Sequence, residues 1–404
     1  MNVENLKFIQ PLFDQAVSQN KVAGLNLLVC KDNKEIGYWQ AGYSNIEEKK
    51  LFSRDTICRL FSMSKPVTSV AAMILIEEGK LDLGEEVGFY LPEFWNLQVC
   101  RGQGKDCKVE KCYKNMVISD LLNMTSGYTY GAWWDGAPKG EWDTSDLINE
   151  LNKDVSSHSF KISTQDFAKR MAKIPLSFEP GSNYSYGLSA DIIGAIIEKV
   201  SGIKYSQFLK KRIFEPLGMK DTDFYVPESK QNRFASTYDR KDLGDGKYEL
   251  NLFTNAHLGI SSDMTKAPSF ESGGAGLCSS INDYMKFCQM LVNGGKLKDT
   301  RILREKTVDY LSNAKLTPKL QECFDRNMEN FAGYTYSNFL RVALNPGSCR
   351  ALTEKGEFGW DGWLGPYMSV DLKNHLTIVM MMQRCGAGTN DITRKMKNII
   401  YSSL

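Results

Sequence analysis

The stretch that decides the fold reads RLFSMSKPVTSVAAMILIEEGKLDL and spans residues 59–83. Its apolar residues recur with the spacing of one helix face: Val67, Val70, Ala71, Ile74 and Leu75. Proline is tolerated in the first helical turn and glycine commonly follows the last, so Pro66 and Gly79 mark the two ends. The pattern predicts a buried helix that begins near Ser62.

Ser62 and Lys65 stand three residues apart, so they share one side of this helix and the amine can reach the hydroxyl. The free N–H groups and the positive dipole end of a helix N-terminus would stabilise a negatively charged tetrahedral intermediate. Ser62 could equally act as a simple helix cap. From this segment alone both interpretations stay open.

The same S-x-x-K pattern occurs at three other serines, Ser18, Ser201 and Ser312. Ser18 and Ser201 close predicted helices, where the helix dipole is negative and would oppose an oxyanion. Ser312 lies in a polar stretch with no apolar helix behind it. Ser62 is therefore the best candidate for a nucleophile.

The sequence holds three histidines and no G-x-S-x-G motif, which disfavours a serine, histidine and acid triad. His375 falls in a predicted hairpin turn and His158 in a polar run, where we expect solvated side chains. The role of His257 stays open. A serine nucleophile would then need lysine or another group as its base.

The chain has 404 residues, 42% of them hydrophobic and 24% charged, which is typical of a globular protein with more than one core. Its formal net charge is +2, with Lys and Arg spread along the chain. This balance disfavours nucleic acid and membrane partners and indicates a small-molecule or peptide substrate. The oligomeric state stays open.

The N-terminal segment carries Glu4 and Asp14 and resembles neither a signal peptide nor a membrane anchor. The apolar run at 377–382 is too short to cross a bilayer. Ten scattered cysteines without an export signal indicate reduced thiols, so we expect a soluble cytoplasmic protein, exported only if a leader has been removed.

The insertion at 98–116 contains Cys100, Cys107 and Cys112, whose C-x6-C-x4-C spacing is not that of a usual zinc site. We therefore expect no metal.

Strand-like runs joined by turns occur at both ends of the chain, in the segments 24–30 with 35–43 and 363–371 with 375–383. The segment 333–344 reads as one further strand, and both termini read as helices. The sequence thus predicts an α+β fold whose antiparallel sheet is built from residues 1–60 and 266–404. Residues 61–265 would form an inserted, mostly helical domain, with the active site in the cleft between the two.

Within that inserted part, a second apolar helix is predicted from a Ser189 cap to a stop at Gly202.

Five segments, in order, resemble the serine β-lactamase-like family, which includes class C β-lactamases, D-Ala-D-Ala carboxypeptidases and related esterases. They are residues 59–83, 118–128, 178–202, 213–224 and 273–295. The resemblance covers most of the chain and implies a β-lactamase/transpeptidase-like fold.

The family's Y-x-N or Y-x-L motif is matched by residues 186–188, which implies that Tyr186 transfers protons as a base and later as an acid, while Tyr184 packs in the core. The family's K-T-G or W-G-G motif is matched by Trp360, Asp361 and Gly362, without the lysine. The resemblance also implies an oxyanion hole made by the N–H groups of Ser62 and Trp363. The expected substrate contacts are Leu188, Trp360, Asp361 and Gly362.

We therefore expect a serine hydrolase that forms an acyl-enzyme at Ser62, uses Lys65 and Tyr186, needs no cofactor, and hydrolyses small carboxylic esters or amides. Two alternatives stay open: a β-lactamase or penicillin-binding-protein-like D-Ala-D-Ala carboxypeptidase, and a catalytically silent binding protein of the same fold. The natural substrate stays open as well. The segment 128–162, with Trp133, Trp134 and Trp142, is expected to line the cleft entrance.

Overall fold

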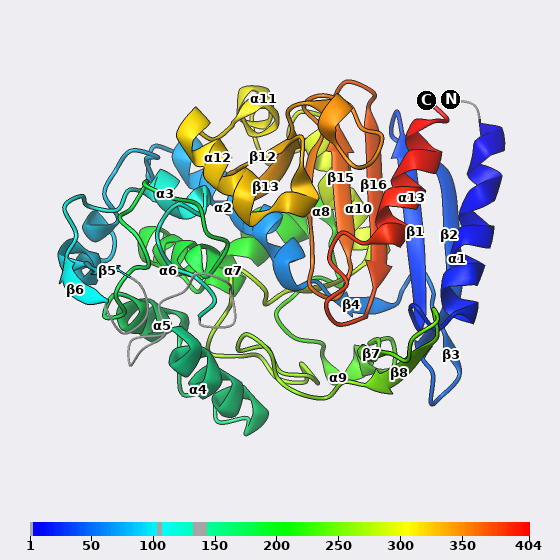
Figure 1. Cartoon of the computed structure of the whole chain (residues 1–404), viewed down its shortest axis with the longest axis horizontal. Helices are drawn as coiled ribbons and strands as arrows, with labels where there is room; N and C mark the ends of the chain where they lie inside the picture. Colours follow the sequence, from blue (N-terminus) through cyan, green and yellow to red (C-terminus); the bar gives the residue numbers. More distant parts are fainter. Residues whose placement is uncertain (1–2, 103–106, 132–143) are drawn as a thin grey trace.

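An eight-stranded antiparallel sheet dominates the computed structural model, which describes residues 3–102, 107–131 and 144–404 (Figure 1). The strand order is β12-β13-β14-β15-β16-β1-β2-β3, so strands from the two ends of the chain meet where β16 pairs with β1. The strands are β1 (Gly24–Lys31), β2 (Lys34–Asn45), β3 (Lys50–Leu51), β12 (Tyr334–Ser337), β13 (Leu340–Ala343), β14 (Phe358–Asp361), β15 (Tyr367–Asp371) and β16 (Leu376–Met382). The expected α+β fold is confirmed.

The side chains of β1 alternate between two cores, because successive residues of a strand point to opposite faces. Leu25, Leu27 and Val29 pack with the terminal helices α1 (Ile9–Ser18) and α13 (Asp391–Tyr401). Leu28 and Cys30 belong to the larger core on the other face, which α10 (Ile281–Val292) covers. Figure 1 shows α1 and α13 together beside β1 and β2. β1 is therefore buried on both faces.

The segment 333–344 forms two strands, whereas the sequence predicted one. Asn338 and Phe339 both have positive φ, 51° and 61°, which is the geometry of a two-residue hairpin turn. The prediction was wrong because alternating apolar residues continue on both sides of this turn and hide it.

Helices and short strands make up the part between residues 61 and 265 (Figure 1). Its longer described helices are α2 (Lys65–Glu77), α4 (Thr144–Ser156), α5 (Thr164–Met171) and α6 (Ser189–Ser201). Shorter ones are α3 (Ile118–Leu122), α7 (Tyr205–Leu209), α8 (Glu215–Leu217) and α9 (Glu228–Gln231). After this part come α11 (Glu305–Asn313), α12 (Pro318–Asn327) and the short pair β10 (Lys296–Leu297) and β11 (Thr300–Arg301). The domain limits at 61 and 265 stay a prediction.

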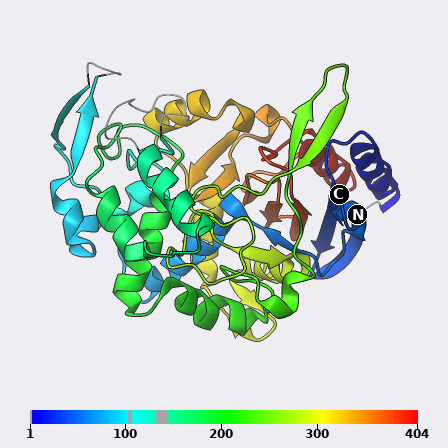
Figure 2. The same cartoon turned by 90° about the horizontal axis from the view of Figure 1, so that it is seen from below.

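Two hairpins in the same part were not predicted, and Figure 2 shows them projecting from the body as separate arms. They are β5 (Gln98–Arg101) with β6 (Lys108–Lys111), and β7 (Tyr238–Asp242) with β8 (Tyr248–Leu252). Cys100 and Cys107 form a disulfide at the first hairpin, with their Cα atoms 5.5 Å apart. This corrects the expectation that all ten cysteines are free thiols, since the hairpin brings together two residues that the scattered spacing did not pair.

A short pair of strands, β4 (Ile57–Arg59) with β9 (Cys278–Ser280), leads the chain into the segment 59–83. A 3-10 turn over Phe61–Ser64 follows, and α2 begins at Lys65. Ser62 thus lies in the tight turn that enters the helix, as predicted from Pro66, and Gly79 follows the helix with a φ of 65°.

The second apolar helix, α6, ends at Gly202 as predicted, but Ser189 is not its cap. Leu188 holds the cap position, and the Ser189 hydroxyl instead lies 2.7 Å from the hydroxyl of Ser126. The hydrogen bond to another loop replaces the local one that a cap would make.

No helix among the described residues is long and apolar enough to pass through a bilayer.

Candidate active site

Lys65 points its amine at the Ser62 hydroxyl. Its Nζ lies 3.2 Å from Ser62 Oγ, 3.1 Å from the Tyr130 hydroxyl and 2.8 Å from the carbonyl oxygen of Gly274. An ammonium group has three protons, and these three acceptors match them. Because Lys65 is fully buried, the amine is held in one place beside the serine.

Burial lowers the pKa of Lys65 to about 7, because a charged amine is poorly solvated there. The carboxylates of Asp191 and Asp361 act in the opposite direction. A lysine with such a pKa is partly neutral near neutral pH, so it can accept a proton from Ser62 Oγ.

Tyr186 lies on the other side of the same amine. Lys65 Nζ is 4.8 Å from the centre of its ring, and the indole N–H of Trp360 donates a hydrogen bond of 2.8 Å to its hydroxyl oxygen. Burial raises the pKa of Tyr186, and hydrogen bonds with Ser62 and Trp360 only partly offset this. Tyr186 therefore rests as a neutral phenol and is better suited to donate a proton than to take the first one.

The sequence did not point to Tyr130, although it accepts a hydrogen bond from Lys65 and packs 5.8 Å, centre to centre, from the Tyr186 ring. Burial raises its pKa, and a hydrogen bond with Ser62 acts against that rise. Two phenols thus flank the candidate nucleophile. The available signal was the second tyrosine of the SGYTY run, two residues beyond the matched segment 118–128.

The turn after β14 lies directly against the start of the Ser62 turn. A Cβ atom at Gly362 would lie 2.1 Å from the Leu60 carbonyl oxygen, so only glycine permits this approach. Within the described part of the chain, the N–H groups of Ser62 and Trp363 donate no hydrogen bond to another group. They remain available for the oxyanion role predicted for them.

A cavity of about 530 Å³ opens over Ser62, a volume suited to a small-molecule ligand. Among the described residues its lining consists of Ser62, Tyr130, Tyr186, His257, Leu258, Met328, Asn330, Phe331, Trp360, Asp361, Trp363, Gly386, Ala387, Gly388 and Thr389. Besides Ser62, this lining contains four of the predicted site residues: Tyr186, Trp360, Asp361 and Trp363. Leu188 and Gly362 are not part of this lining, so direct contact between either residue and a substrate is not supported.

His257, whose role the sequence left open, stacks on the Trp363 ring at 4.0 Å in the wall of this cavity. Burial lowers the pKa of His257 to about 4, so it is neutral at neutral pH. His158 is half-buried and hydrogen-bonded to Asp263, and His375 lies in the predicted turn with a φ of 51°. Neither of these two lines the cavity within the described residues.

Asp361 is the one Asp, Glu, Lys or Arg in the described lining of the cavity. The Thr389 hydroxyl donates a hydrogen bond to its carboxylate. Burial raises the pKa of Asp361, while the Thr389 hydrogen bond and the charge of Arg341 act against the rise. The position that holds a threonine in the lactamase motif thus carries a carboxylate, and no described cation faces the cavity beside it.

The other three S-x-x-K serines make local hydrogen bonds. Ser18 and Ser312 donate to backbone carbonyl groups one helical turn earlier, and Ser201 bonds with Ile203. Of the four serines, Ser62 is the one whose hydroxyl accepts a hydrogen bond from the lysine three residues on.

Trp133, Trp134 and Trp142 lie outside the described residues, so their expected place at the cleft entrance stays a prediction.

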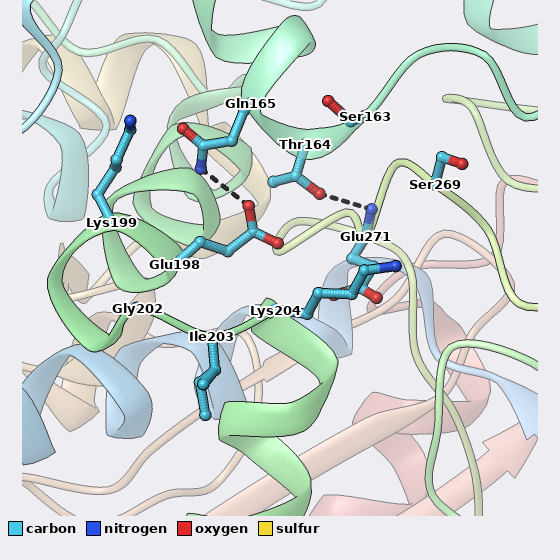
Figure 3. A pocket seen from close by; sticks show the side chains of 10 residues that line it. All are labelled: Ser163, Thr164, Gln165, Glu198, Lys199, Gly202, Ile203, Lys204, Ser269 and Glu271. Atoms are coloured by element: carbon cyan, nitrogen blue, oxygen red, sulfur yellow. Dashed lines mark hydrogen bonds between the residues drawn. The ribbon is translucent and has the colours of Figure 1, made fainter.

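A second cavity, of about 400 Å³, lies at the C-terminal end of α6 and shares none of the described lining of the first (Figure 3). Glu198 and Glu271 contribute to its lining from different segments (Figure 3). Both carboxylates already accept hydrogen bonds, Glu198 from Gln165 and Glu271 from Ser206.

Among the described residues no group of three or more His, Cys, Asp or Glu side chains is arranged to hold a metal ion.

The sequence model of the family described as Beta-lactamase matches residues 9–398. Esterase EstB of Burkholderia gladioli is 28% identical over 305 residues, which cover 72% of this chain and 71% of EstB. A putative D-alanyl-D-alanine carboxypeptidase of Salmonella agona is 26% identical over 89% of this chain and 78% of its own.

Among solved structures, unliganded simvastatin synthase from Aspergillus terreus superposes with a TM-score of 0.80 at 22% identity, over 99% of this chain and 98% of that one. At this identity the likeness shows the fold alone.

Proposed function

The chain belongs to the beta-lactamase family of hydrolases, and we propose that it hydrolyses small neutral carboxylic esters or amides through an acyl-enzyme at Ser62. The observation that carries the proposal is the hydrogen bond from the buried Lys65 amine to Ser62 Oγ. It supplies a candidate nucleophile with a base whose pKa lies near neutrality.

In the first half-reaction, Ser62 Oγ attacks the carbonyl carbon and its proton passes to neutral Lys65. The carbonyl π electrons move to oxygen, and the N–H groups of Ser62 and Trp363 stabilise that oxyanion. When the intermediate collapses, the bond to the alcohol or amine breaks. The leaving group takes a proton from Tyr186, which regains one from Lys65, and the acyl-enzyme remains.

In the second half-reaction, water attacks the acyl carbon and gives its proton to Lys65, either directly or through one of the two tyrosines. A second oxyanion forms in the same place and then collapses with release of the carboxylic acid. Ser62 leaves as a neutral hydroxyl, because Lys65 returns the proton to its Oγ. The cycle needs no other reactant than water.

The cavity supports a neutral and largely apolar substrate. Trp360, Phe331 and Trp363 give it flat apolar walls, with Phe331 stacked 5.3 Å from Trp360. Asp361 is negatively charged when ionised and would repel a substrate carboxylate. β-Lactams and D-Ala-D-Ala peptides carry such a carboxylate beside the scissile bond, so the β-lactamase and carboxypeptidase alternative ranks second. The likeness to EstB supports the same order.

The test is covalent labelling with a fluorophosphonate, whose phosphorus is attacked by an activated serine with loss of fluoride. Peptide mass mapping should find the adduct on Ser62 in the parent protein and none in Ser62→Ala. Ser201→Ala is the matched control, since it removes a serine of the same S-x-x-K pattern and should label fully. An adduct on another serine, or ester turnover that survives Ser62→Ala, refutes the proposal. A protein that neither labels nor hydrolyses any ester supports the silent binding protein instead.

A further inference from the structure

A buried carboxylate lies behind the proposed base. Asp191 is in the first turn of α6, five residues after Tyr186, and is 2% exposed. Its Oδ1 accepts hydrogen bonds from the Ser272 hydroxyl at 2.5 Å and from the Gly274 N–H at 3.0 Å. Neither the S-x-x-K pattern nor the family motifs matched at residues 186–188 and 360–362 assign it a role.

Gly274 joins this carboxylate to the lysine. Its N–H donates to Asp191, and its carbonyl oxygen accepts from Lys65 Nζ at 2.8 Å. A Cβ atom at Gly274 would lie 2.9 Å from Asp191 Oδ2 and 3.3 Å from Lys65 Nζ. The carboxylate and the amine therefore approach the same face of one glycine. Asp191 Oδ2 and Lys65 Nζ can therefore be no farther apart than the 2.9 Å and the 3.3 Å taken together.

We propose that Asp191 is a positioning residue: through the Gly274 peptide it holds the Lys65 amine against Ser62, and it stabilises the positive charge that Lys65 acquires when the serine gives up its proton. The proposal rests on the proposed function in that it gives Lys65 the role of base. Its physical content, a charge coupling between two buried side chains, is measurable without a substrate.

The other groups that face Lys65 do not supply this countercharge. Tyr130 and Tyr186 are neutral because burial raises the pKa of each. Asp361 also acts on Lys65, but after Asp191 in strength, and its carboxylate is engaged by Thr389.

Asp191 itself is faced by Lys65, by the phenols of Tyr130 and Tyr205, and by the donors of the 272–274 turn. Burial raises the pKa of Asp191, while Lys65, Ser272 and Gly274 favour its ionised form. The two buried groups are thus coupled by charge without direct contact, and one of them, Lys65, must change charge during the reaction.

The decisive variant is Asp191→Asn, which removes the charge and keeps the shape. An opposite charge a few ångströms away raises the pKa of an amine, so its loss should lower the pKa of Lys65 by at least about one unit. The acidic limb of kcat/KM for a neutral ester should move to lower pH by the same amount. The direct readout is the pH titration of the Lys65 Nζ resonance in substrate-free protein, assigned by its absence in Lys65→Arg.

Glu271→Gln is the matched control. Glu271 is a buried carboxylate adjacent to Ser272, but it bonds with Ser206 and lines the second cavity (Figure 3). Glu271→Gln should leave the pKa of Lys65 and the acidic limb of kcat/KM unchanged. Asp191→Glu keeps the charge, so it should hold the pKa of Lys65 close to its value in the parent protein.

The proposal is overturned if folded Asp191→Asn titrates as the parent does and loses activity equally at every pH, since that is a structural role alone. If Asp191→Asn does not fold, Ser272→Ala takes its place, because it keeps the carboxylate but removes one of its donors. A smaller shift in the same direction supports the proposal, and no shift overturns it. Failure of the proposed function shows itself differently, as no adduct at Ser62 with the Lys65 titration still shifted.

Discussion

The indole N–H of Trp360 donates a hydrogen bond of 2.8 Å to the Tyr186 hydroxyl, so the last strand before the predicted oxyanion turn is tied to the proposed proton donor. The two residues are 174 positions apart in the chain. This bond fixes the direction in which the phenol can present its proton, toward Ser62 and the cavity.

Trp360→Phe should therefore lower kcat/KM for a neutral ester by about tenfold, the equivalent of one hydrogen bond of about 1.4 kcal/mol. The fold should persist, because Phe fills most of the same apolar space. Trp95→Phe is the control, since Trp95 packs on Phe89 and does not line the cavity in the described part of the chain. Equal losses in the two variants would mean that the bond to Tyr186 has no catalytic role.

The variants Tyr186→Phe and Tyr130→Phe distinguish the roles of the two phenols. Removing a proton donor that acts in the transition state typically costs about a hundredfold or more in turnover. We expect that loss for Tyr186→Phe and a smaller one for Tyr130→Phe, which keeps the ring but loses an acceptor for Lys65. Rates should be measured with a good and a poor leaving group, because a missing acid affects the poor one more. A larger loss in Tyr130→Phe would exchange the two roles.

The pH dependence follows from the pKa of Lys65. The base must be neutral to accept the serine proton, and Lys65 is protonated below about pH 7. The value of kcat/KM should therefore fall tenfold per unit as pH drops below that value. A profile that is flat down to pH 5 would remove Lys65 from the role of base.

The same shift predicts a stability effect. Burial lowers the pKa of Lys65 from 10.5 to about 7, so between these values the unfolded chain holds a proton that the folded protein lacks. Stability contributed by this group is therefore lost as pH falls through that window. Lys65→Met removes this pH-dependent penalty, but it also loses three hydrogen bonds and leaves the buried Asp191 without its countercharge. We expect the variant to be inactive, and its stability relative to the parent protein to be lower at pH 10 than at pH 7.

Chemical denaturation at pH 7 and pH 10 measures this effect: the stability of the parent protein should rise between the two pH values by more than that of Lys65→Met. Lys80→Met, at an exposed position paired with Glu78, is the control and should show no such trend. A stability difference between Lys65→Met and the parent protein that is the same at both pH values would contradict the argument.

Part of this site follows directly from the sequence. Ser62 and Lys65 are three residues apart, so helix geometry alone brings them together, and Pro66 shows where the helix starts. Tyr186 and Trp360 needed the family resemblance, because nothing local links positions so far apart.

For Tyr130 the one signal was its place two residues beyond the matched segment 118–128, and for Asp191 no local pattern indicated a role. Tyr130 lies in a loop without periodicity, and Asp191 interrupts an apolar helix pattern as a surface residue would. Asp191 is buried only because the turn at Ser272 folds over it from 81 residues away. His257 reached the cavity wall in the same way, through tertiary packing on Trp363.

The last prediction is that neutral esters are preferred over esters with a carboxylate beside the scissile bond. Asp361 is the acidic side chain of the described cavity lining, and the Arg384 and Arg394 side chains are not part of that lining. A substrate carboxylate about 4 Å from Asp361 would be repelled by roughly 1 kcal/mol if well hydrated and by about 4 kcal/mol at an effective dielectric of 20. At about 1.4 kcal/mol per tenfold, this disfavours the anionic ester by roughly fivefold to a thousandfold in kcat/KM.

Two short-chain esters that differ only in that carboxylate measure the ratio of kcat/KM for the neutral ester to kcat/KM for the anionic one. Asp361→Thr should reduce it by removing the repulsion, and Trp360→Lys should reduce it further by adding the cation that the lactamase motif carries. Arg394 borders an adjacent crevice with Arg341 and Arg350, so Arg394→Gln is the control and should leave the ratio unchanged. Equal rates for the two esters in the parent protein, or a ratio that falls only in Arg394→Gln, would contradict the charge argument and bring the β-lactam and peptide substrates back to first place.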